Sequence, residues 1–130
     1  MNGRSRVIAV LDDEPEMLKA LSRLLSARGF RVVLFSSGAE LLAAPDGAGF
    51  DCLIVDLHMP AMSGFDVLGA IAARKTHPPV VVLTGHDDPG HPDGVRALGA
   101  AEYLLKPVDQ AVLLAAIERV LRPAEPPPPC

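Results

Sequence analysis

Short apolar runs recur along the chain, and four of them stop abruptly at a charged or hydroxyl-bearing residue. Runs this short and this rich in aliphatic side chains are typical of parallel strands buried on both faces. The four runs are Val7–Leu11, Cys52–Val55, Val80–Leu83 and Tyr103–Leu105. With a more mixed fifth run, they predict strands at Arg6–Leu11, Arg31–Phe35, Cys52–Asp56, Val80–Leu83 and Glu102–Leu105.

The segments that follow these strands carry apolar residues at helical spacing. That spacing predicts an amphipathic helix after each strand. Gly29 is suited to end the first helix as its C′ residue, and Asp109 is suited to cap the last one. The predicted helices are Pro15 to about Arg28, Ala39–Ala44, Gly64–Arg74, Pro92–Leu98 and Asp109–Leu121.

Strands that alternate with helices through short links imply right-handed crossovers and a parallel sheet. Five such strands fit a doubly wound, flavodoxin-like α/β fold with strand order 2-1-3-4-5 and helices on both faces. In that order the first and third strands lie side by side at the switch point of the sheet. Ligands of such folds bind at this point, outside the carboxyl ends of the strands.

The composition indicates one globular domain. The chain has 130 residues, of which 49% are hydrophobic and 22% charged, enough for a single core. A net charge of −4 without a basic stripe argues against direct nucleic-acid binding. We find no apolar stretch of membrane-spanning length and no signal-peptide pattern, so we expect the domain to work in the cytoplasm. Residues 1–122 form the predicted domain, and the mostly proline segment 123–130 is a predicted disordered tail or linker.

Neither the cysteines nor the histidines predict a metal site. Cys52 opens a core strand and Cys130 ends the tail, so we expect one buried structural thiol and one free exposed thiol rather than a disulfide. The histidines lack the spacing of zinc ligands. They are His58, His77, His86 and His91.

Polar side chains stand where the predicted strands end: Asp12 and Asp13, Asp56, Thr84 and Lys106. Each alone is an ordinary turn or strand terminus. Because parallel strands end at one edge of the sheet, together they predict a shallow pocket suited to Mg²⁺ and a phosphoryl group. Asp12 and Asp13 suit the metal, and Asp56 is the candidate nucleophile for an aspartyl phosphate. Thr84 and Lys106 are candidate donors to the phosphoryl oxygens.

These residues lie in motifs that resemble the receiver domain of bacterial two-component response regulators, over roughly Arg6 to Leu121. The sequence looks most like receivers that precede LuxR-type DNA-binding domains, and similar receivers end hybrid histidine kinases. The matching motifs are Asp12-Asp13, Asp56-Leu57-His58-Met59-Pro60 leading to Met62-Ser63-Gly64, Thr84-Gly85 and Lys106-Pro107.

The resemblance implies a phosphorylation switch that catalyses only its own phosphotransfer and autodephosphorylation. Asp56 would accept the phosphoryl group from a sensor histidine kinase, and Thr84 and Lys106 would bind it. Asp13 would bind Mg²⁺ directly, together with Asp56, whereas Asp12 would act through water. The backbone carbonyl of His58 would be a further ligand.

The resemblance also concerns residues around this pocket. It implies a cis bond between Lys106 and Pro107, which X-Pro bonds tolerate. Tyr103 matches the switch aromatic of the family, although a half-buried strand aromatic is an equal reading. The side chains of His58 and His86 either border the phosphoryl group or are solvated loop histidines.

The fourth helix departs from the family pattern. Its segment is interrupted by Pro89, Gly90, Pro92 and Gly94. The resembled family usually signals through the face formed by the fourth helix, fifth strand and fifth helix, so the resemblance implies an output domain or partner at this face, or a phosphorylation-dependent homodimer. Because glycines raise the entropy lost on ordering and prolines remove backbone donors, we expect Asp87–Leu98 to be the least ordered part of the domain before phosphorylation. We expect this segment to become more ordered after phosphorylation.

Two other functions are open to the same residues. A Mg²⁺-dependent phosphatase with an aspartyl-phosphate intermediate would usually carry a second acid two residues after Asp56, where this chain has His58. A flavin-binding protein of this fold would need a phosphate-cradling loop rich in Ser, Thr and Gly after the first strand. The segment Asp12–Pro15 is acidic instead, and its negative charge would repel a phosphate.

Overall fold

The computed structural model of the chain describes residues 6–44, 49–57, 59, 63–74, 77–85 and 91–121, with the side chains of 91 and 92 excepted. Residues 122–130, with the predicted tail and Cys130, lie outside them, so the domain boundary stays a prediction. The strands are β1 (Val7–Leu11), β2 (Arg31–Phe35), β3 (Cys52–Val55), β4 (Val80–Thr84) and β5 (Glu102–Leu105). The helices are α1 (Pro15–Ala27), α2 (Gly38–Ala43), α3 (Gly64–Ala72), α4 (His91–Ala97) and α5 (Gln110–Leu121).

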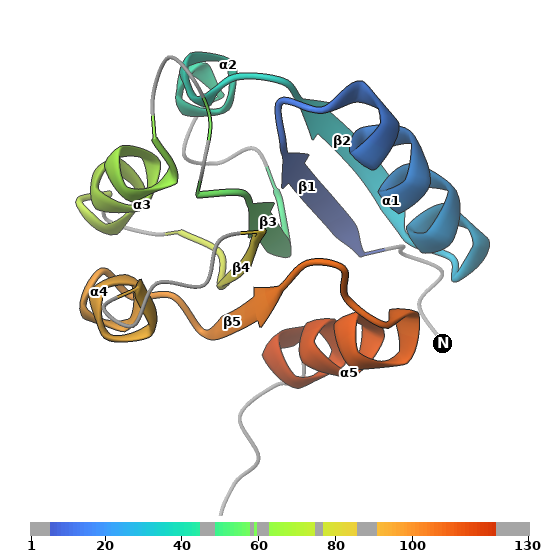
Figure 1. Ribbon diagram of the computed structural model, residues 1–130. Coiled ribbons are helices and arrows are strands. Elements are labelled where there is room, and N and C mark those ends of the chain that lie inside the picture. The colour runs from blue at the N-terminus through green and yellow to red at the C-terminus, as the bar shows by residue number, and fades with distance from the viewer. Residues whose placement is uncertain are drawn as a thin grey trace, which may run out of the picture.

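The five strands form one sheet in the order β2-β1-β3-β4-β5, and all four pairings are parallel. Helices α1 and α5 cover one face, and α2, α3 and α4 cover the other (Figure 1). The predicted doubly wound fold and strand order are therefore confirmed. Within the described residues, no helix combines the length and the apolar character that crossing a membrane requires.

Helix α1 begins and ends where the local sequence predicts. Pro15 occupies its first turn, where the missing N–H is not needed. At the other end Gly29 has φ +90°, a conformation that glycine adopts without strain. The N–H groups of Gly29 and Phe30 then donate to the carbonyls of Ser26 and Leu25 at 3.0 and 3.1 Å, which forms a Schellman motif.

Helix α4 is present despite its helix-breaking residues. Val95 is fully buried and belongs to the apolar cluster on this side of the sheet. A Cβ built on Gly94 would lie 3.5 Å from the ring of Phe65, an ordinary contact distance, so the Phe65 side chain of α3 reaches α4 at this glycine. Tertiary burial thus offsets a poor local propensity. The segment 86–90 lies outside the described residues, and the expected ordering of Asp87–Leu98 on phosphorylation stays a prediction.

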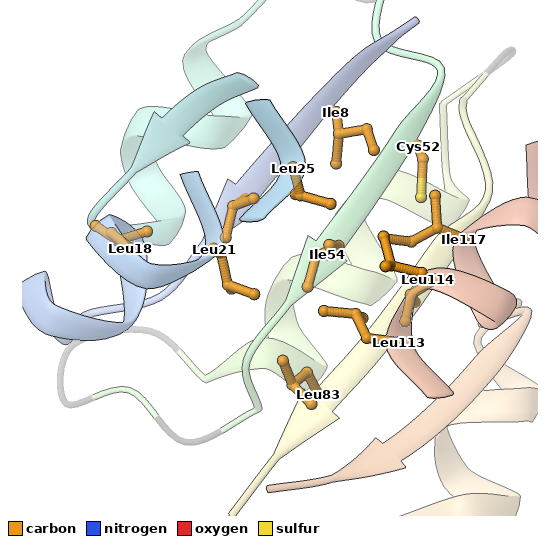
Figure 2. Close-up of a cluster of buried hydrophobic side chains, with 12 residues drawn as sticks. Ile8, Leu18, Leu21, Leu25, Cys52, Ile54, Leu83, Leu113, Leu114 and Ile117 are labelled. Carbon is orange, nitrogen blue, oxygen red and sulfur yellow. The ribbon is translucent and has the colours of Figure 1, made fainter. Parts of the chain in front are cut away.

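The core consists of two layers that follow the alternation of side chains along the strands. Figure 2 shows the layer between the sheet and helices α1 and α5. Ile8, Ile54 and Leu83 belong to this layer, whereas their neighbours Ala9, Val55 and Val82 belong to the layer under α2, α3 and α4. Cys52 is fully buried, as predicted, and burial raises the pKa of its thiol to about 12.

Burial on both faces is confirmed for β1, β3 and β4 and is wrong for β5. Leu105 is 40% exposed, and the rest of β5 is only half-buried. The reason is the strand order, because β5 is the edge strand next to β4 and has no neighbour on its other side. The apolar run Tyr103–Leu105 therefore does not mark a central strand.

The start of α3 lies against the backbone that follows β3. The N–H of Gly64 donates to the carbonyl of Leu57 at 2.9 Å. A Cβ on Gly64 would lie 2.5 Å from both the carbonyl oxygen of Asp56 and Cα of Leu57. Only glycine permits this approach. Ser63 fixes the helix start, because its hydroxyl accepts a hydrogen bond from the N–H of Asp66.

We expect Gly64→Ala to lower the free energy of unfolding by about 2 kcal/mol or more, because backbone atoms must move to make room. Gly69→Ala is the matched control in the same helix, since a Cβ there meets nothing within 4 Å. It should stabilise the domain by about 0.5–1 kcal/mol through helix propensity. Urea unfolding of both variants tests the argument, and an equal effect of the two substitutions would contradict it.

Candidate functional site

The sheet register brings the predicted pocket residues to one edge. Leu11 pairs with Val55, and the N–H of Asp56 donates to the carbonyl of Leu11 at 3.0 Å. Asp12 and Asp56 are therefore the residues that come immediately after this pair, at the ends of the neighbouring strands β1 and β3. Asp12 and Asp56 are 2% and 5% exposed, so both carboxylates are held at the edge with little solvent.

Three carboxylates converge at this edge. One oxygen each from Asp12, Asp13 and Asp56 lie within 4.8 Å of one another, and Asp13 is half-buried. Close carboxylates repel, and a divalent cation between them relieves this repulsion. Carboxylate oxygens are ligands that Mg²⁺ prefers, so the donor set fits one such ion.

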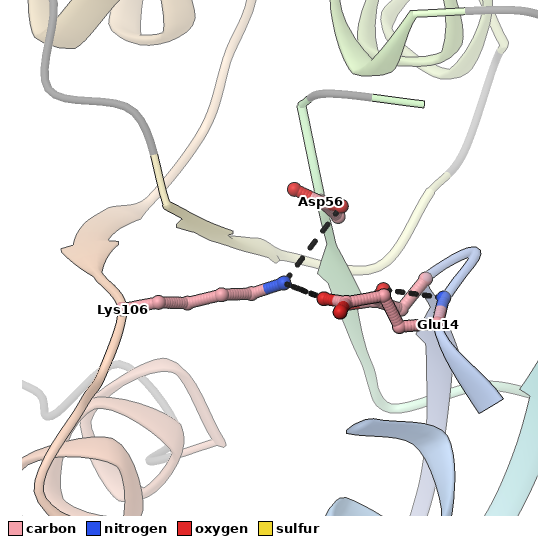
Figure 3. A network of polar contacts seen from close by, with 4 residues as sticks. Glu14, Asp56 and Lys106 are labelled. Atoms are coloured by element: carbon pink, nitrogen blue, oxygen red, sulfur yellow. Dashed lines mark hydrogen bonds and ion pairs between the residues drawn. The ribbon is translucent and has the colours of Figure 1, made fainter. Parts of the chain in front are cut away.

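Lys106 supplies the positive charge of the cluster (Figure 3). Its Nζ donates a hydrogen bond to Oδ2 of Asp12 at 2.8 Å, and lies 3.8 Å from Oδ2 of Asp56 and 3.7 Å from Oε1 of Glu14. Burial lowers the pKa of Lys106, but the hydrogen bond and charge of Asp12, followed by the charges of Asp56 and Glu14, raise it further. The net pKa is above the ordinary value for lysine, so the side chain is an ammonium at neutral pH.

Asp12 is held from two sides. Its Oδ2 accepts from Lys106, and its Oδ1 accepts from the backbone N–H of Glu14 at 3.0 Å. The sequence predicted Asp12 as a metal ligand and Lys106 as a phosphoryl ligand, but not that the two bind one another. Sequence reasoning also missed Glu14 as a pocket residue. The available signal was its place two residues after Asp12, the spacing at which an aspartate accepts from the chain.

Thr84 and Tyr103 lie towards the face of the sheet that α2, α3 and α4 cover. Thr84 is fully buried at the end of β4, in phase with Val80 and Val82 of the layer under α2, α3 and α4. Tyr103 is half-buried, pairs with Val82 and packs against the same layer. Asp12, Asp56 and Lys106 are instead in phase with residues of the layer under α1 and α5. The sheet thus divides the predicted pocket residues into two groups.

The remaining predicted site residues have mixed outcomes. The Lys106–Pro107 peptide bond is cis. The N–H of Lys106 donates to the carbonyl of Thr84 at 2.7 Å, which ties the ends of β4 and β5 together. His58 and His86 lie outside the described residues, so the predicted metal-binding carbonyl and both imidazole roles remain predictions.

Comparison with known proteins finds relatives over most of the chain. A family model described as "Response regulator receiver domain" matches residues 8–118. The transcriptional regulatory protein FixJ of Bradyrhizobium diazoefficiens is 36% identical over 119 residues, which are 92% of this chain and 58% of FixJ. The transcriptional regulatory protein KdpE of Mycobacterium tuberculosis is 40% identical over 118 residues, 89% of this chain and 51% of KdpE. The chain thus spans little more than half the length of these curated relatives.

Solved structures agree with these relatives. The chemotaxis protein CheY4 of Vibrio cholerae has a TM-score of 0.85 to this chain at 30% identity, over 91% of this chain and 100% of that one. The similarity to CheY4 therefore covers a complete protein chain of the same fold, whereas FixJ and KdpE extend beyond the matched part.

We expect Asp13→Asn to raise the free energy of unfolding by about 1 kcal/mol without divalent cations, because it removes one of three mutually repelling carboxylates. Asp66→Asn is the control, because Asp66 is exposed in the first turn of α3 and losing its charge there should lower the free energy of unfolding by about 0.5 kcal/mol, the opposite direction. Thermal unfolding in a metal chelator measures both variants. A loss of stability in Asp13→Asn would show that the carboxylate cluster is not a source of repulsion.

Proposed function

The chain belongs to the response regulator receiver family, and we propose that it is a signalling domain switched by phosphorylation of Asp56. The observation that carries this proposal is the convergence of three carboxylates and one ammonium at the edge of the sheet. Proteins of this family generally act as signalling proteins rather than as enzymes with separate substrates. Neither the family match nor the relatives named above favour the phosphatase or flavin-binding reading.

In the proposed reaction a carboxylate oxygen of Asp56 attacks the phosphorus of a phosphohistidine or acyl phosphate. The bond from phosphorus to the donor breaks, and the donor nitrogen or oxygen leaves with the electron pair. An aspartyl phosphate remains. Lys106, 3.8 Å from Asp56, is close enough to pair with the new phosphoryl oxygens after leaving Asp12. The hydroxyl of Thr84 is the proposed second donor.

We propose Mg²⁺ as the cofactor, with Asp13 and Asp56 as direct ligands and Asp12 acting through water. When bound, the ion neutralises carboxylate and phosphoryl charge. The resemblance to the receiver family implies the indirect role of Asp12, and the hydrogen bonds that its two oxygens accept from Lys106 and from the backbone of Glu14 are compatible with it. The carbonyl of His58 is the proposed further ligand.

The proposed phosphoryl donor is a sensor histidine kinase in the cytoplasm, and the proposed output surface is formed by α4, β5 and α5. Leu105 and Val112 on that surface are 40% and 47% exposed. Arg119 of α5 pairs with both carboxylate oxygens of Glu102 in β5 at 2.9 and 3.1 Å. An output domain, a separate partner or a second copy of the chain are all compatible with this surface. Residues 123–130 are the proposed disordered tail or linker that follows the domain.

The proposed switch uses Thr84 and Tyr103. Phosphorylation adds about −1.5 to −2 charges and three acceptor oxygens, which attract the hydroxyl of Thr84. Because Thr84 and Tyr103 pack on the same side of neighbouring strands, a shift of Thr84 changes the space available to the tyrosine ring. A coupling of about 1–3 kcal/mol between pocket and output surface is the ordinary range for such a link.

We expect incubation with acetyl phosphate and Mg²⁺ to add one phosphoryl group to the wild type, detected by intact mass, and none to Asp56→Asn. Asp66→Asn is the control, because this carboxylate is exposed and belongs to α3 rather than to a strand end. It should be labelled like the wild type. Labelling of Asp56→Asn at the wild-type rate would refute the assignment of the phosphoacceptor.

We expect Mg²⁺ to bind with a dissociation constant of about a millimolar, because the site has few protein ligands and the ion keeps several waters. Asp13→Asn should weaken binding by about tenfold, and Asp12→Asn by less. An NMR titration of the two variants measures the difference. If Asp12→Asn weakens binding more than Asp13→Asn does, the direct and indirect roles are exchanged.

A further inference from the structure

Glu14 lies at the rim of the pocket and has no assigned role. Its Oε1 is 3.7 Å from Nζ of Lys106, while 66% of its side chain is exposed to solvent. It is the N-cap residue of α1, but its side chain accepts no capping hydrogen bond. The carboxylate is therefore not used to start the helix and instead adds a charge to the entrance of the pocket.

The backbone of Glu14 is fixed by several constraints. Its N–H donates to Asp12 at 3.0 Å, and its carbonyl accepts from Leu18 at 3.1 Å. Pro15 restricts it further to extended conformations, and the observed φ and ψ are −92° and 115°. The side chain thus leaves a rigid point of the chain, and its charge stays near the entrance.

Glu14 increases an excess of negative charge around the pocket. Asp12 and Asp56 already lie within ion-pair distance of the ammonium of Lys106, with Asp13 beside them, and Glu14 is a third carboxylate within that distance. A small phosphoryl donor such as acetyl phosphate is doubly negative at neutral pH. Such a donor must approach Asp56 past this exposed charge, and repulsion lowers its local concentration.

We propose that Glu14 determines the donor specificity of the pocket by slowing phosphorylation by small, doubly charged acyl phosphates. This inference rests on the proposed function, in which Asp56 accepts the phosphoryl group. The step itself is unchanged. The Asp56 carboxylate forms the new bond to phosphorus, the bond between phosphorus and the acetate oxygen breaks, and acetate leaves with the electron pair. Glu14 acts only on the approach of the donor, so the pocket favours donors that carry less negative charge.

The test is the rate of Asp56 phosphorylation in Glu14→Gln, with Mg²⁺ and either acetyl phosphate or phosphoramidate. Phosphoramidate has a protonated nitrogen and a smaller net negative charge. At low salt we expect Glu14→Gln to react about threefold faster with acetyl phosphate, and by a smaller factor with phosphoramidate. The difference should nearly vanish at about 0.5 M salt, where charges at this distance are screened.

Glu16→Gln is the matched control, because Glu16 is an exposed acid in the first turn of the same helix. It should react like the wild type. The inference is overturned if Glu14→Gln matches Glu16→Gln, or if both donors accelerate equally at every salt concentration. In either case a wild type labelled on Asp56 leaves the proposed function intact. A wild type that neither donor labels overturns the proposed function and this inference with it.

Discussion

The repulsion between carboxylates at the carboxyl edge of the sheet is the constraint on which the rest of the pocket depends. Asp12 and Asp56 are almost fully buried, and Asp13 lies beside them. Buried carboxylates without compensation are strongly unfavourable. Lys106 provides that compensation within the chain, through a 2.8 Å hydrogen bond to Asp12 and a longer ion pair with Asp56. Because Lys106 offsets only part of this negative charge, a cation or a phosphoryl group that enters the pocket would change the ion pairs of Lys106.

The pattern of the sequence was sufficient to predict the fold and the residues at the edge. Strand ends can be recognised locally, because an apolar run stops at a polar residue. Because the alternation of strands and helices implies a parallel sheet, the strand ends at Asp12, Asp56, Thr84 and Lys106 must share one edge. Helix ends at Gly29 and Asp109 were equally local, since the glycine conformation and the aspartate cap depend on neighbouring residues.

Other features depend on contacts between distant parts of the chain and could not be read from the pattern. The pairing of Lys106 with Asp12 joins residues 94 positions apart, and the choice of partner among several acids depends on side-chain geometry. Helix α4 forms because Val95 is buried, although its segment has poor helix propensity. Leu105 is exposed because β5 is the edge strand of the sheet. The apolar residues around Leu105 wrongly suggested a central strand.

The division of the pocket between the two faces of the sheet has a consequence for how such a domain diversifies. Asp12, Asp56 and Lys106 are in phase with the α1 and α5 side, whereas Thr84 and Tyr103 belong with the side covered by α2, α3 and α4. Substitutions that remodel one layer therefore leave the packing of the other largely intact. Under the proposed function Thr84 is the exception, since it would bind the phosphoryl group while packing with the same layer as Tyr103, so a substitution at Thr84 would change the chemistry and the packing together.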